Sequence, residues 1–216
     1  MVVLDNGGVS GAKALNAIPA GPGTAVTIHG APNTSIWGGA GPVTIDDPRR
    51  ITIAEGAGDA SATVSGTGDL IAGNNFSDTI LASGSNITIQ AGTGSNSLSA
   101  SGSHDLIVSG SGSDTIMVSG ANDTVDARTD ASTVTLSGSA GVFLGGAAGF
   151  DLLDTGSSDT VFAGTGAGFV TASGSAGVVF GGSGPLVLVT SVGGSGAETL
   201  FGGSGNTSVF GGVADR

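Results

Sequence analysis

Cysteine is absent from the 216-residue sequence, which excludes a disulfide framework and thiol chemistry. Basic residues are also scarce, since five Lys and Arg stand against seventeen Asp and Glu, for a formal net charge of −12. A chain with this balance repels phosphate backbones, so we expect no nucleic-acid partner. Divalent cations are more compatible with its charge.

Long hydrophobic runs are missing too. No apolar stretch reaches the length of a membrane-spanning helix, and residues 1–5 lack the basic region and apolar core of a Sec signal peptide. Yet 38% of the residues are apolar and only 10% are charged, which is the opposite of a disordered composition. The sequence therefore predicts a folded chain with no membrane span.

A strict period runs through the chain instead. Over sixteen positions, every ninth residue is apolar. These residues are Ile53, Ala62, Ile71, Ile80, Ile89, Leu98, Ile107, Ile116, Val125, Val134, Phe143, Leu152, Val161, Val170, Val179 and Leu188. A periodicity sustained over so many positions indicates a repeated structural unit.

Glycine adds a second ladder with twice the period. The glycines spaced by eighteen, each preceded by Ser or Thr, are Gly66, Gly84, Gly102, Gly120, Gly138, Gly156 and Gly174. On alternate nines lie Gly92, Gly110, Gly146, Gly164 and Gly182, with Arg128 as the break. The unit is an eighteen-residue coil of two similar nonapeptide halves, each a Gly- and Ser-rich turn and a strand of three or four residues. It predicts an all-β fold, a β-solenoid of the parallel β-roll or β-helix type, because one unit alone cannot bury its apolar face.

The period divides the chain into four segments. Residues 1–23 carry no register and are expected to form an N-terminal cap or assembly segment, and residues 24–52 are expected to form irregular, Pro-containing first coils. Residues 53–190 form the regular solenoid. After a slip of three residues, 191–216 hold terminal Gly-Gly-x-Gly repeats and a short tail. Trp37, the single Trp, is predicted to plug the core as a cap, with a carbohydrate or partner contact as the alternative.

The terminal repeats carry a motif. Residues 193–201 and 202–210, with Gly181-Gly182-Ser183-Gly184 before them, resemble the Gly-Gly-x-Gly-x-Asp-x-apolar-x nonapeptide of the repeats-in-toxin, or hemolysin-type calcium-binding, family. The resemblance covers roughly residues 60–210. It implies a parallel β-roll with calcium in the turns, bound by Asp carboxylates and backbone carbonyls. It also implies type I secretion, and hence an extracellular or cell-surface location in a bacterium without a cleaved Sec signal.

The motif's Asp position is only partly acidic in this chain. It holds Asp69, Asp78, Asp105, Asp114, Asp123, Asp159, Asn96 and Glu198. The other turns carry Ile, Ser, Gly, Phe, Leu or Thr there, so about half of the turns lack an anionic ligand. The resemblance therefore implies calcium at a minority of the turns and no other cofactor.

Calcium takes six to eight oxygen ligands, and in a β-roll those for one ion come from successive turns on one edge. The calcium candidates accordingly form two columns: Asp78, Asn96 and Asp114 on one edge, and Asp105 and Asp123 on the other. The alternative is that these side chains cap the turns through hydrogen bonds to the backbone.

Catalytic chemistry finds little support in the sequence. His29 and His104 lie in different parts of the period, and no His, Asp and Glu cluster has transition-metal spacing. The paired carboxylates are Asp46-Asp47 and Asp151 with Asp154. Glycosidase chemistry needs two carboxyl groups across a cleft, which a narrow rod does not offer, so we expect no enzymatic activity.

Two functions of different class remain. The first is a non-enzymatic extracellular structural protein that assembles end to end into a filament, surface layer or matrix and adhesive fibre. Its repeats run almost to Arg216 without a polar cap, and open strand edges template further pairing. The partner is then a second copy, head to tail, with the cell surface or an extracellular polysaccharide as a further partner. Uncapped ends equally fit a fragment of a longer adhesin.

The second function is a calcium-responsive repeat module of a type I-secreted adhesin, toxin or enzyme, which folds only when calcium offsets the repulsion among its Asp side chains. Ice or surface binding by a flat Thr array is not favoured, because Thr67, Thr93 and Thr165 do not fall on one regular eighteen-residue column.

Overall fold

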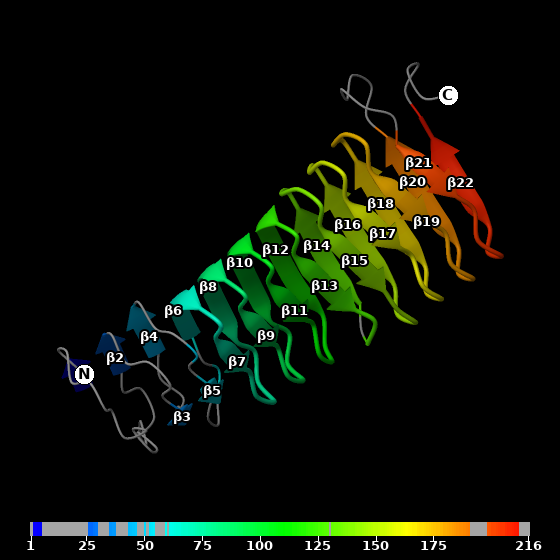
Figure 1. The fold of residues 1–216 in the computed structure, drawn as a ribbon. Helices are drawn as coiled ribbons and strands as arrows, with labels where there is room; N and C mark the ends of the chain where they lie inside the picture. Colours follow the sequence, from blue (N-terminus) through cyan, green and yellow to red (C-terminus); the bar gives the residue numbers. More distant parts are fainter. Residues whose placement is uncertain are drawn as a thin grey trace.

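The computed structural model describes the backbone of four early strands, and both backbone and side chains of residues 50, 52–54, 59, 61–129, 131–190 and 198–211. Within these residues there is no helix, and the strands pair in parallel in two sheets. The fold is therefore the predicted parallel β-solenoid. Figure 1 shows its coils stacked along one axis, with β1 and β22 at opposite ends.

One sheet has twelve strands and is called the long sheet here. In spatial order these are β1 (Val2–Asp5), β2 (Val26–His29), β4 (Val43–Asp46), β6 (Ser61–Thr67), β8 (Thr79–Ser85), β10 (Ser97–Ser103), β12 (Asp114–Ala121), β14 (Ser132–Leu136), β16 (Phe150–Asp154), β18 (Gly168–Ala172), β20 (Leu186–Thr190) and β22 (Thr207–Phe210). At about 4.8 Å per strand, the sheet extends roughly 50 Å along the axis.

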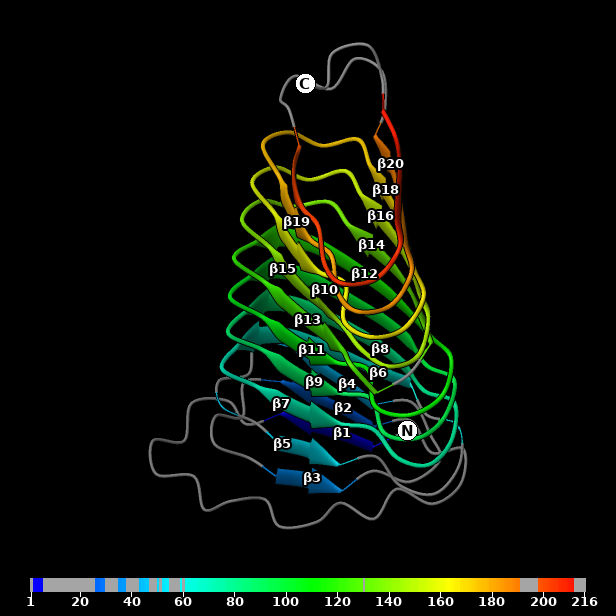
Figure 2. The ribbon, with the colours of Figure 1, turned by 90° about the vertical axis from the view of Figure 1, so that its right-hand side faces the viewer.

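The other sheet has ten strands and is called the short sheet. In spatial order these are β21 (Thr199–Phe201), β19 (Val178–Phe180), β17 (Thr160–Phe162), β15 (Val142–Gly145), β13 (Thr124–Ala127), β11 (Leu106–Val108), β9 (Thr88–Gln90), β7 (Leu70–Ala72), β5 (Thr52–Ala54) and β3 (Ser35–Trp37). Figure 2 shows how turns on both sides join the two sheets into closed coils.

The core lies between the sheets and is built from the nine-residue ladder. All sixteen ladder residues from Ile53 to Leu188 are buried, with Phe143 the largest. Because side chains alternate across a strand, each ladder residue points inward while its neighbours on the strand point outward. The prediction of the core from the period is confirmed.

The coil length departs from eighteen residues at both ends. In the regular part Leu98 pairs with Ile116, eighteen residues on. The first coils have twenty-four, seventeen and nineteen residues, since Val2 pairs with Val26, Val26 with Val43 and Val43 with Ala62. Strand β20 pairs with β22 twenty-one residues on, which is the predicted slip of three. Of the predicted cap at 1–23, only strand β1 lies within the described residues.

The two halves of the coil are less alike than the nonapeptide repeat suggests. Strands of the long sheet between β6 and β20 have five to eight residues, whereas those of the short sheet have three or four. The long strands β6, β8, β10 and β12 run through the Ser-Gly pair of the glycine ladder, so that these glycines belong to the sheet rather than to a turn.

The glycine ladder is required by close approach between coils. A Cβ at Gly102 would lie 1.4 Å from the carbonyl oxygen of Gly84, and at Gly138 1.8 Å from that of Gly120. Gly102 also has a φ of 149°, in the region that favours glycine. A side chain at these positions would force successive coils apart.

Left-handed backbone occurs in a column that is mostly not glycine. One residue per coil, just before the turn into the short sheet, has φ between 54° and 74°. The column consists of Arg50, Gly68, Asn86, His104, Asn122, Ala140, Ser158 and Ala176. Asn, His and Gly accept this conformation readily, whereas Ala does not. The column thus changes from well-suited residues to poorly suited ones towards the C-terminus.

Candidate functional site

The acidic residues lie in two stacks at the corners of the coil. The first corner column precedes or begins the strands of the long sheet and holds Asp78, Asn96, Asp114, Ser132, Phe150, Gly168 and Leu186. The second corner column precedes the strands of the short sheet and holds Asp69, Ile87, Asp105, Asp123, Gly141, Asp159, Gly177 and Glu198. Apart from Glu198, which is partly buried, all these side chains or backbones are buried. The two predicted calcium columns are therefore real stacks, and both point into the protein.

In the first corner column, the side chains of Asn96 and Asp114 each bind the backbone of the coil before them. The Asp78 amide donates to Asn96 Oδ1 at 2.9 Å, and the Asn96 amide donates to Asp114 Oδ1 at 2.8 Å. The Asn96 Nδ2 group also donates to Asp114 Oδ1, at 3.0 Å. The column is thus a continuous chain of hydrogen bonds along the rod axis.

The second corner column repeats this arrangement with carboxylates. The Ile87 amide donates to Asp105 Oδ1 at 2.8 Å, and the Asp105 amide donates to Asp123 Oδ1 at 2.9 Å. Further on, the Gly141 amide donates to Asp159 Oδ1 at 2.6 Å. These side chains therefore cap backbone amides, which was the alternative to calcium binding. Each hydrogen bond joins one coil to the next rather than closing a turn within one coil.

The first corner column becomes apolar beyond Ser132. Phe150 packs on Phe143, with ring centroids 4.9 Å apart. Its ring also occupies the space that a side chain at position 168 would need, since a Cβ on Gly168 would lie 2.5 Å from it. The amides are now bound by the main chain, as the Phe150 amide donates to the Ala167 carbonyl at 3.0 Å.

Burial changes the acidity of the second corner column. It raises the pKa of Asp105 to about 6, with the charge of Asp123 adding to the effect, and it raises the pKa of Asp123 as well. Burial also raises the pKa of Asp159 to about 7, and the nearby negative charges of Asp154 and Glu198 contribute. Burial therefore lets these carboxyl groups keep their proton to a higher pH than an exposed Asp does.

Among the described residues, the acidic side chains of the corner columns are not gathered in groups of three or more around one point. Calcium needs six to eight oxygen atoms around one point. In the part of the chain that the structure describes, no three His, Cys, Asp or Glu side chains are grouped so as to hold a metal ion. The inward Oδ1 atoms of Asn96, Asp105, Asp114 and Asp123 are already occupied by amide groups. Calcium binding stays a prediction of the family resemblance.

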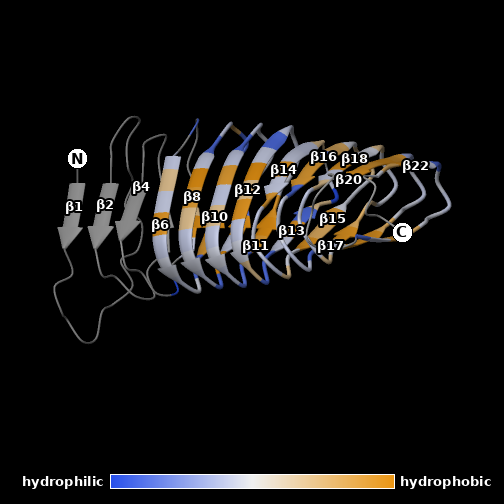
Figure 3. Ribbon diagram, turned by 90° about the horizontal axis from the view of Figure 1, so that it is seen from above, coloured by the Kyte–Doolittle hydropathy of each residue, from blue (hydrophilic) through white to orange (hydrophobic). Residues whose placement is uncertain are grey.

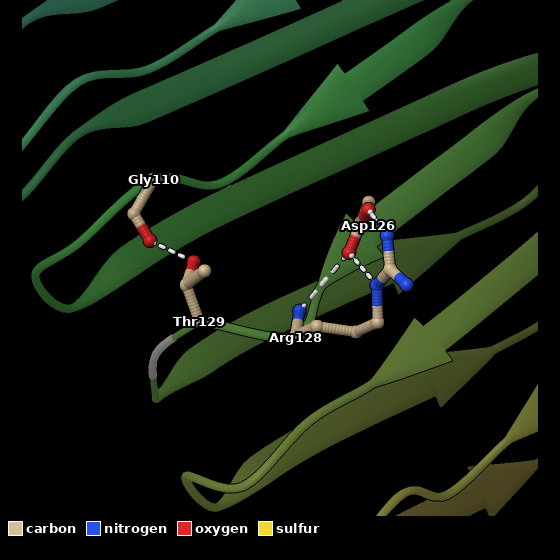
Figure 4. A network of polar contacts seen from close by, with 4 residues as sticks. All are labelled: Gly110, Asp126, Arg128 and Thr129. Carbon is tan, nitrogen blue, oxygen red and sulfur yellow. Dashed lines mark hydrogen bonds and ion pairs between the residues drawn. The ribbon is translucent and has the colours of Figure 1, made fainter.

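Arg128, the break in the glycine ladder, forms an ion pair at the surface with Asp126. Its Nε atom donates to Asp126 Oδ1 at 2.8 Å, and an NH2 group reaches Asp126 Oδ2 at 2.5 Å (Figure 4). This guanidinium holds the pKa of Asp126 below its usual value. Thr129 donates to the Gly110 carbonyl beside it. The break is accommodated because Gly146, in the next coil, lies directly against the Arg128 backbone.

Of the two carboxylate pairs, Asp151 and Asp154 separate in the fold, whereas Asp47 lies outside the described residues. Asp151 and Asp154 both belong to β16, where Asp151 is exposed and Asp154 is buried, so they lie on opposite faces of the sheet. Asp154 Oδ1 accepts the Gly156 amide at 2.9 Å. A shallow depression of about 320 Å³ over the starts of β12, β14 and β16 is lined by Asp114 and Asp151 among others.

The histidines are also placed. His104 is exposed at its turn. His29 lies on β2, in register with Asp5 on β1 and Asp46 on β4, a juxtaposition that step counting missed because the early coils are not eighteen residues long. The side chain of Trp37 lies outside the described residues, and its predicted role stays open.

A feature that sequence reasoning missed lies on the outer face of the short sheet. Three Phe side chains, Phe162, Phe180 and Phe201, stack on one another there, with ring centroids 4.9 and 5.0 Å apart. Steps of eighteen and then twenty-one residues connect them, so the register that predicted the core would have found them if it had also been followed from outward positions.

Comparison of the chain with protein-family models, with curated proteins and with solved structures gave no significant match. Among the described residues, none forms a helix with the length and hydropathy that a membrane crossing requires. The functional argument therefore depends on the geometry of the solenoid itself.

Proposed function

We propose that this protein is a non-enzymatic structural protein of the cell exterior, whose rods join end to end into a filament, surface layer or fibre. The observation that carries the proposal is the coil at residues 198–211. Val209 continues the core column of Leu188, its partner in the sheet, but it is 51% exposed where Leu188 is 1% exposed. A core position open to solvent is a surface for a further coil.

The strand edges support the same contact. Strands β22 and β21 are the outermost strands of the two sheets at one end of the rod, and β1 and β3 at the other. The outer edge of a terminal strand presents N–H and C=O groups that template pairing with an added strand. Because each described strand pairs in parallel, a second copy added in the same orientation continues the solenoid, and such a head-to-tail contact propagates without closing.

Electron microscopy of the purified full chain tests this proposal with a matched pair of variants. Val209→Lys places a charge on the end surface, whereas Ser208→Lys places the same charge on the neighbouring residue, which points out from the sheet. Filaments are expected from the unchanged chain and from Ser208→Lys, with filament length at least about ten-fold shorter in Val209→Lys because a buried unpaired charge is strongly unfavourable. Dispersed rods from the unchanged chain at all concentrations would contradict end-to-end assembly.

The same protein samples test the second candidate function, a calcium-responsive module. Its supporting observation is that Oδ2 of buried Asp105 has no hydrogen-bond partner, which leaves one carboxylate oxygen available. A module of this kind loses β-structure by circular dichroism in excess chelator and regains it with millimolar calcium. Filaments that persist in both conditions favour the structural function, and calcium is then an accessory.

A further inference from the structure

The outer face of the short sheet carries an aromatic ladder at its C-terminal end. The ladder consists of Phe162, Phe180 and Phe201, on β17, β19 and β21. Phe162 is 41% exposed and Phe201 is 53% exposed, so the rings stand out from the sheet. The positions in register with Phe162 in earlier coils hold Trp37 on β3 and then, without a further aromatic residue, Ala54, Ala72, Gln90, Val108, Asp126 and Leu144. The ladder is therefore confined to one end of the rod.

The orientation of the rings restricts what can bind. Adjacent ring planes meet at 7° and 11°, so the rings lie face to face along the rod axis. The faces between rings are already covered by the next Phe, and the ladder presents mainly ring edges to solvent. A nucleobase or a cation binds to an aromatic face, and the ladder does not offer such faces in a row. The ring edges fit an apolar surface that packs against them.

The outward positions of the strands that carry the ladder hold no charged side chain. The outward residues of the four strands from β15 to β21 are Val142, Leu144, Thr160, Phe162, Val178, Phe180, Thr199 and Phe201. The turns that follow these strands consist of Gly, Ala, Ser, Thr, Pro and Asn. Figure 3 shows this part of the rod coloured largely as hydrophobic. In a chain with a net charge of −12, this face is one where two copies approach without direct charge repulsion.

We propose that a second copy of this chain packs on the aromatic ladder, face to face, so that two rods lie side by side. The ring spacing of 4.9 to 5.0 Å equals the rise of one coil, about 4.8 Å. A partner meshes with the whole ladder only if its own side chains repeat with that rise, and a second copy has this property by construction. Such an isologous contact brings the ladders of both copies together.

The size of the face predicts a weak pair. With about 200 Å² for a Phe side chain, the exposed parts of Phe162 and Phe201 present roughly 190 Å². Four strands of three or four residues form a face about 12 Å wide and offer roughly 230 Å² per copy. The pair then buries less than the roughly 1,200 Å² typical of stable complexes, so pairing is expected to depend on concentration.

With the two-fold axis parallel to the rod axis, the two rods lie parallel along their full length. This pairing is distinct from end-to-end assembly, because it doubles the cross-section of the particle and leaves its length unchanged. Small-angle X-ray scattering measures the cross-sectional radius of gyration, and sedimentation velocity gives the dissociation constant. Both are recorded for the full chain from micromolar to millimolar concentration, using Val209→Lys as the background so that filaments do not interfere.

Two substitutions and a matched control locate the contact. Phe180→Ser removes the central ring. Thr160→Lys keeps all three rings and adds a charge beside Phe162, and Thr88→Lys makes the same change at the same position of the coil four coils earlier. Both Lys variants reduce the net negative charge equally, so general repulsion falls by the same amount in each.

The expected result is a cross-section that grows with concentration, with the dissociation constant raised about ten-fold or more by Phe180→Ser and by Thr160→Lys but not by Thr88→Lys. A cross-section that stays that of one rod at every concentration overturns the proposal. Equal effects of Thr160→Lys and Thr88→Lys also overturn it, because pairing then uses another face. Neither result bears on the filament test, which is read from particle length.

Discussion

The N-terminal and C-terminal halves of the solenoid use different hydrogen-bond acceptors for the buried backbone amide at the first corner column. At the first corner column, each buried amide needs an acceptor from the following coil. In the N-terminal half the acceptor is a side-chain oxygen, as Asn96 provides for Asp78, whereas at Phe150 it is the main-chain carbonyl of Ala167. Because the main chain can supply the acceptor, the corner side chain need not be polar. The same position of the coil therefore carries either a hydrogen-bonded chain or a hydrophobic layer.

The surface changes in the same direction along the rod. Residues 50–129 expose charged side chains at Arg50, Asp59 and Arg128. In the described residues from 131 onwards, the one exposed charged side chain is Asp151. A surface without charge promotes association, and a charged one keeps copies apart. The comparison indicates that the N-terminal half is suited to solvent and the C-terminal half to contact with other copies.

The largest expected effect on the free energy of unfolding comes from Phe150, in the apolar part of the first corner column. Phe150→Ala is predicted to destabilise the fold by about 3–5 kcal/mol, since it empties the space above Gly168 and removes the contact with Phe143. Asn96→Ala, at the same position three coils earlier, leaves the Asp78 amide without its acceptor and is predicted to cost about 1–3 kcal/mol. Urea unfolding followed by circular dichroism measures both.

A neighbouring Phe provides the control for this prediction. Phe169→Ala also removes a ring, but the side chain points outward and is 42% exposed, so a cost below about 1 kcal/mol is expected. Equal costs for Phe150→Ala and Phe169→Ala would show that the corner layer contributes no special packing. Coincident transitions by circular dichroism and Trp fluorescence are needed, because repeat arrays can unfold in stages.

The buried carboxyl groups give the second effect, which depends on pH. Burial raises the pKa of Asp159 from 3.8 to about 7, so the folded state binds a proton more tightly than the unfolded state. Stability from this group is fully present below about pH 4 and is lost as the pH rises towards about 7. The melting temperature is therefore expected to be higher at pH 5 than at pH 8.

Asp159→Asn isolates that contribution. The Asn side chain cannot ionise, but its amide oxygen can still accept the Gly141 N–H group. Asn96 accepts the Asp78 N–H group in this way in the first corner column. The variant is expected to be more stable than the unchanged chain at pH 8, with a smaller pH dependence. Asp126→Asn is the control with opposite sign, since Arg128 lowers the pKa of Asp126 and its contribution is lost on acidification. A pH dependence unchanged by Asp159→Asn would place the titrating group elsewhere.

The sequence predicts the fold well because one number, the nine-residue step, sets which side chains face inward. From Ile53 to Leu188, no ladder residue deviates from burial. The same step places Asp78, Asn96 and Asp114 in one stack, which the hydrogen bonds between coils confirm. Periodicity determines position in the coil, and position in the coil determines which residues meet.

The chemistry of the corners is not determined by that spacing. An Asp every eighteen residues fits a cation between turns and equally fits an amide of the preceding coil, and the choice depends on the direction of the side chain. The left-handed column was missed for a similar reason. A residue with positive φ is expected to be Gly, whereas here Arg, Asn, His, Ser and Ala occupy the position in seven of the eight coils. The backbone is imposed by the stack rather than by local preference.

The smallest expected effect on stability concerns the column of residues with positive φ, in which the N-terminal and C-terminal halves also differ. Ala140 has a φ of 54° and no polar side chain to compensate, whereas Asn122, one coil earlier, has a φ of 60° and belongs to a residue type that tolerates it. Ala140→Asn is therefore predicted to stabilise the fold by about 0.5–1 kcal/mol in urea unfolding. The matched change Ala167→Asn, at an exposed residue without positive φ, is expected to be neutral or slightly unfavourable. If both changes have the same effect, the strain attributed to Ala140 is relaxed by the surrounding coils, and the two halves differ in packing and charge but not in backbone energy.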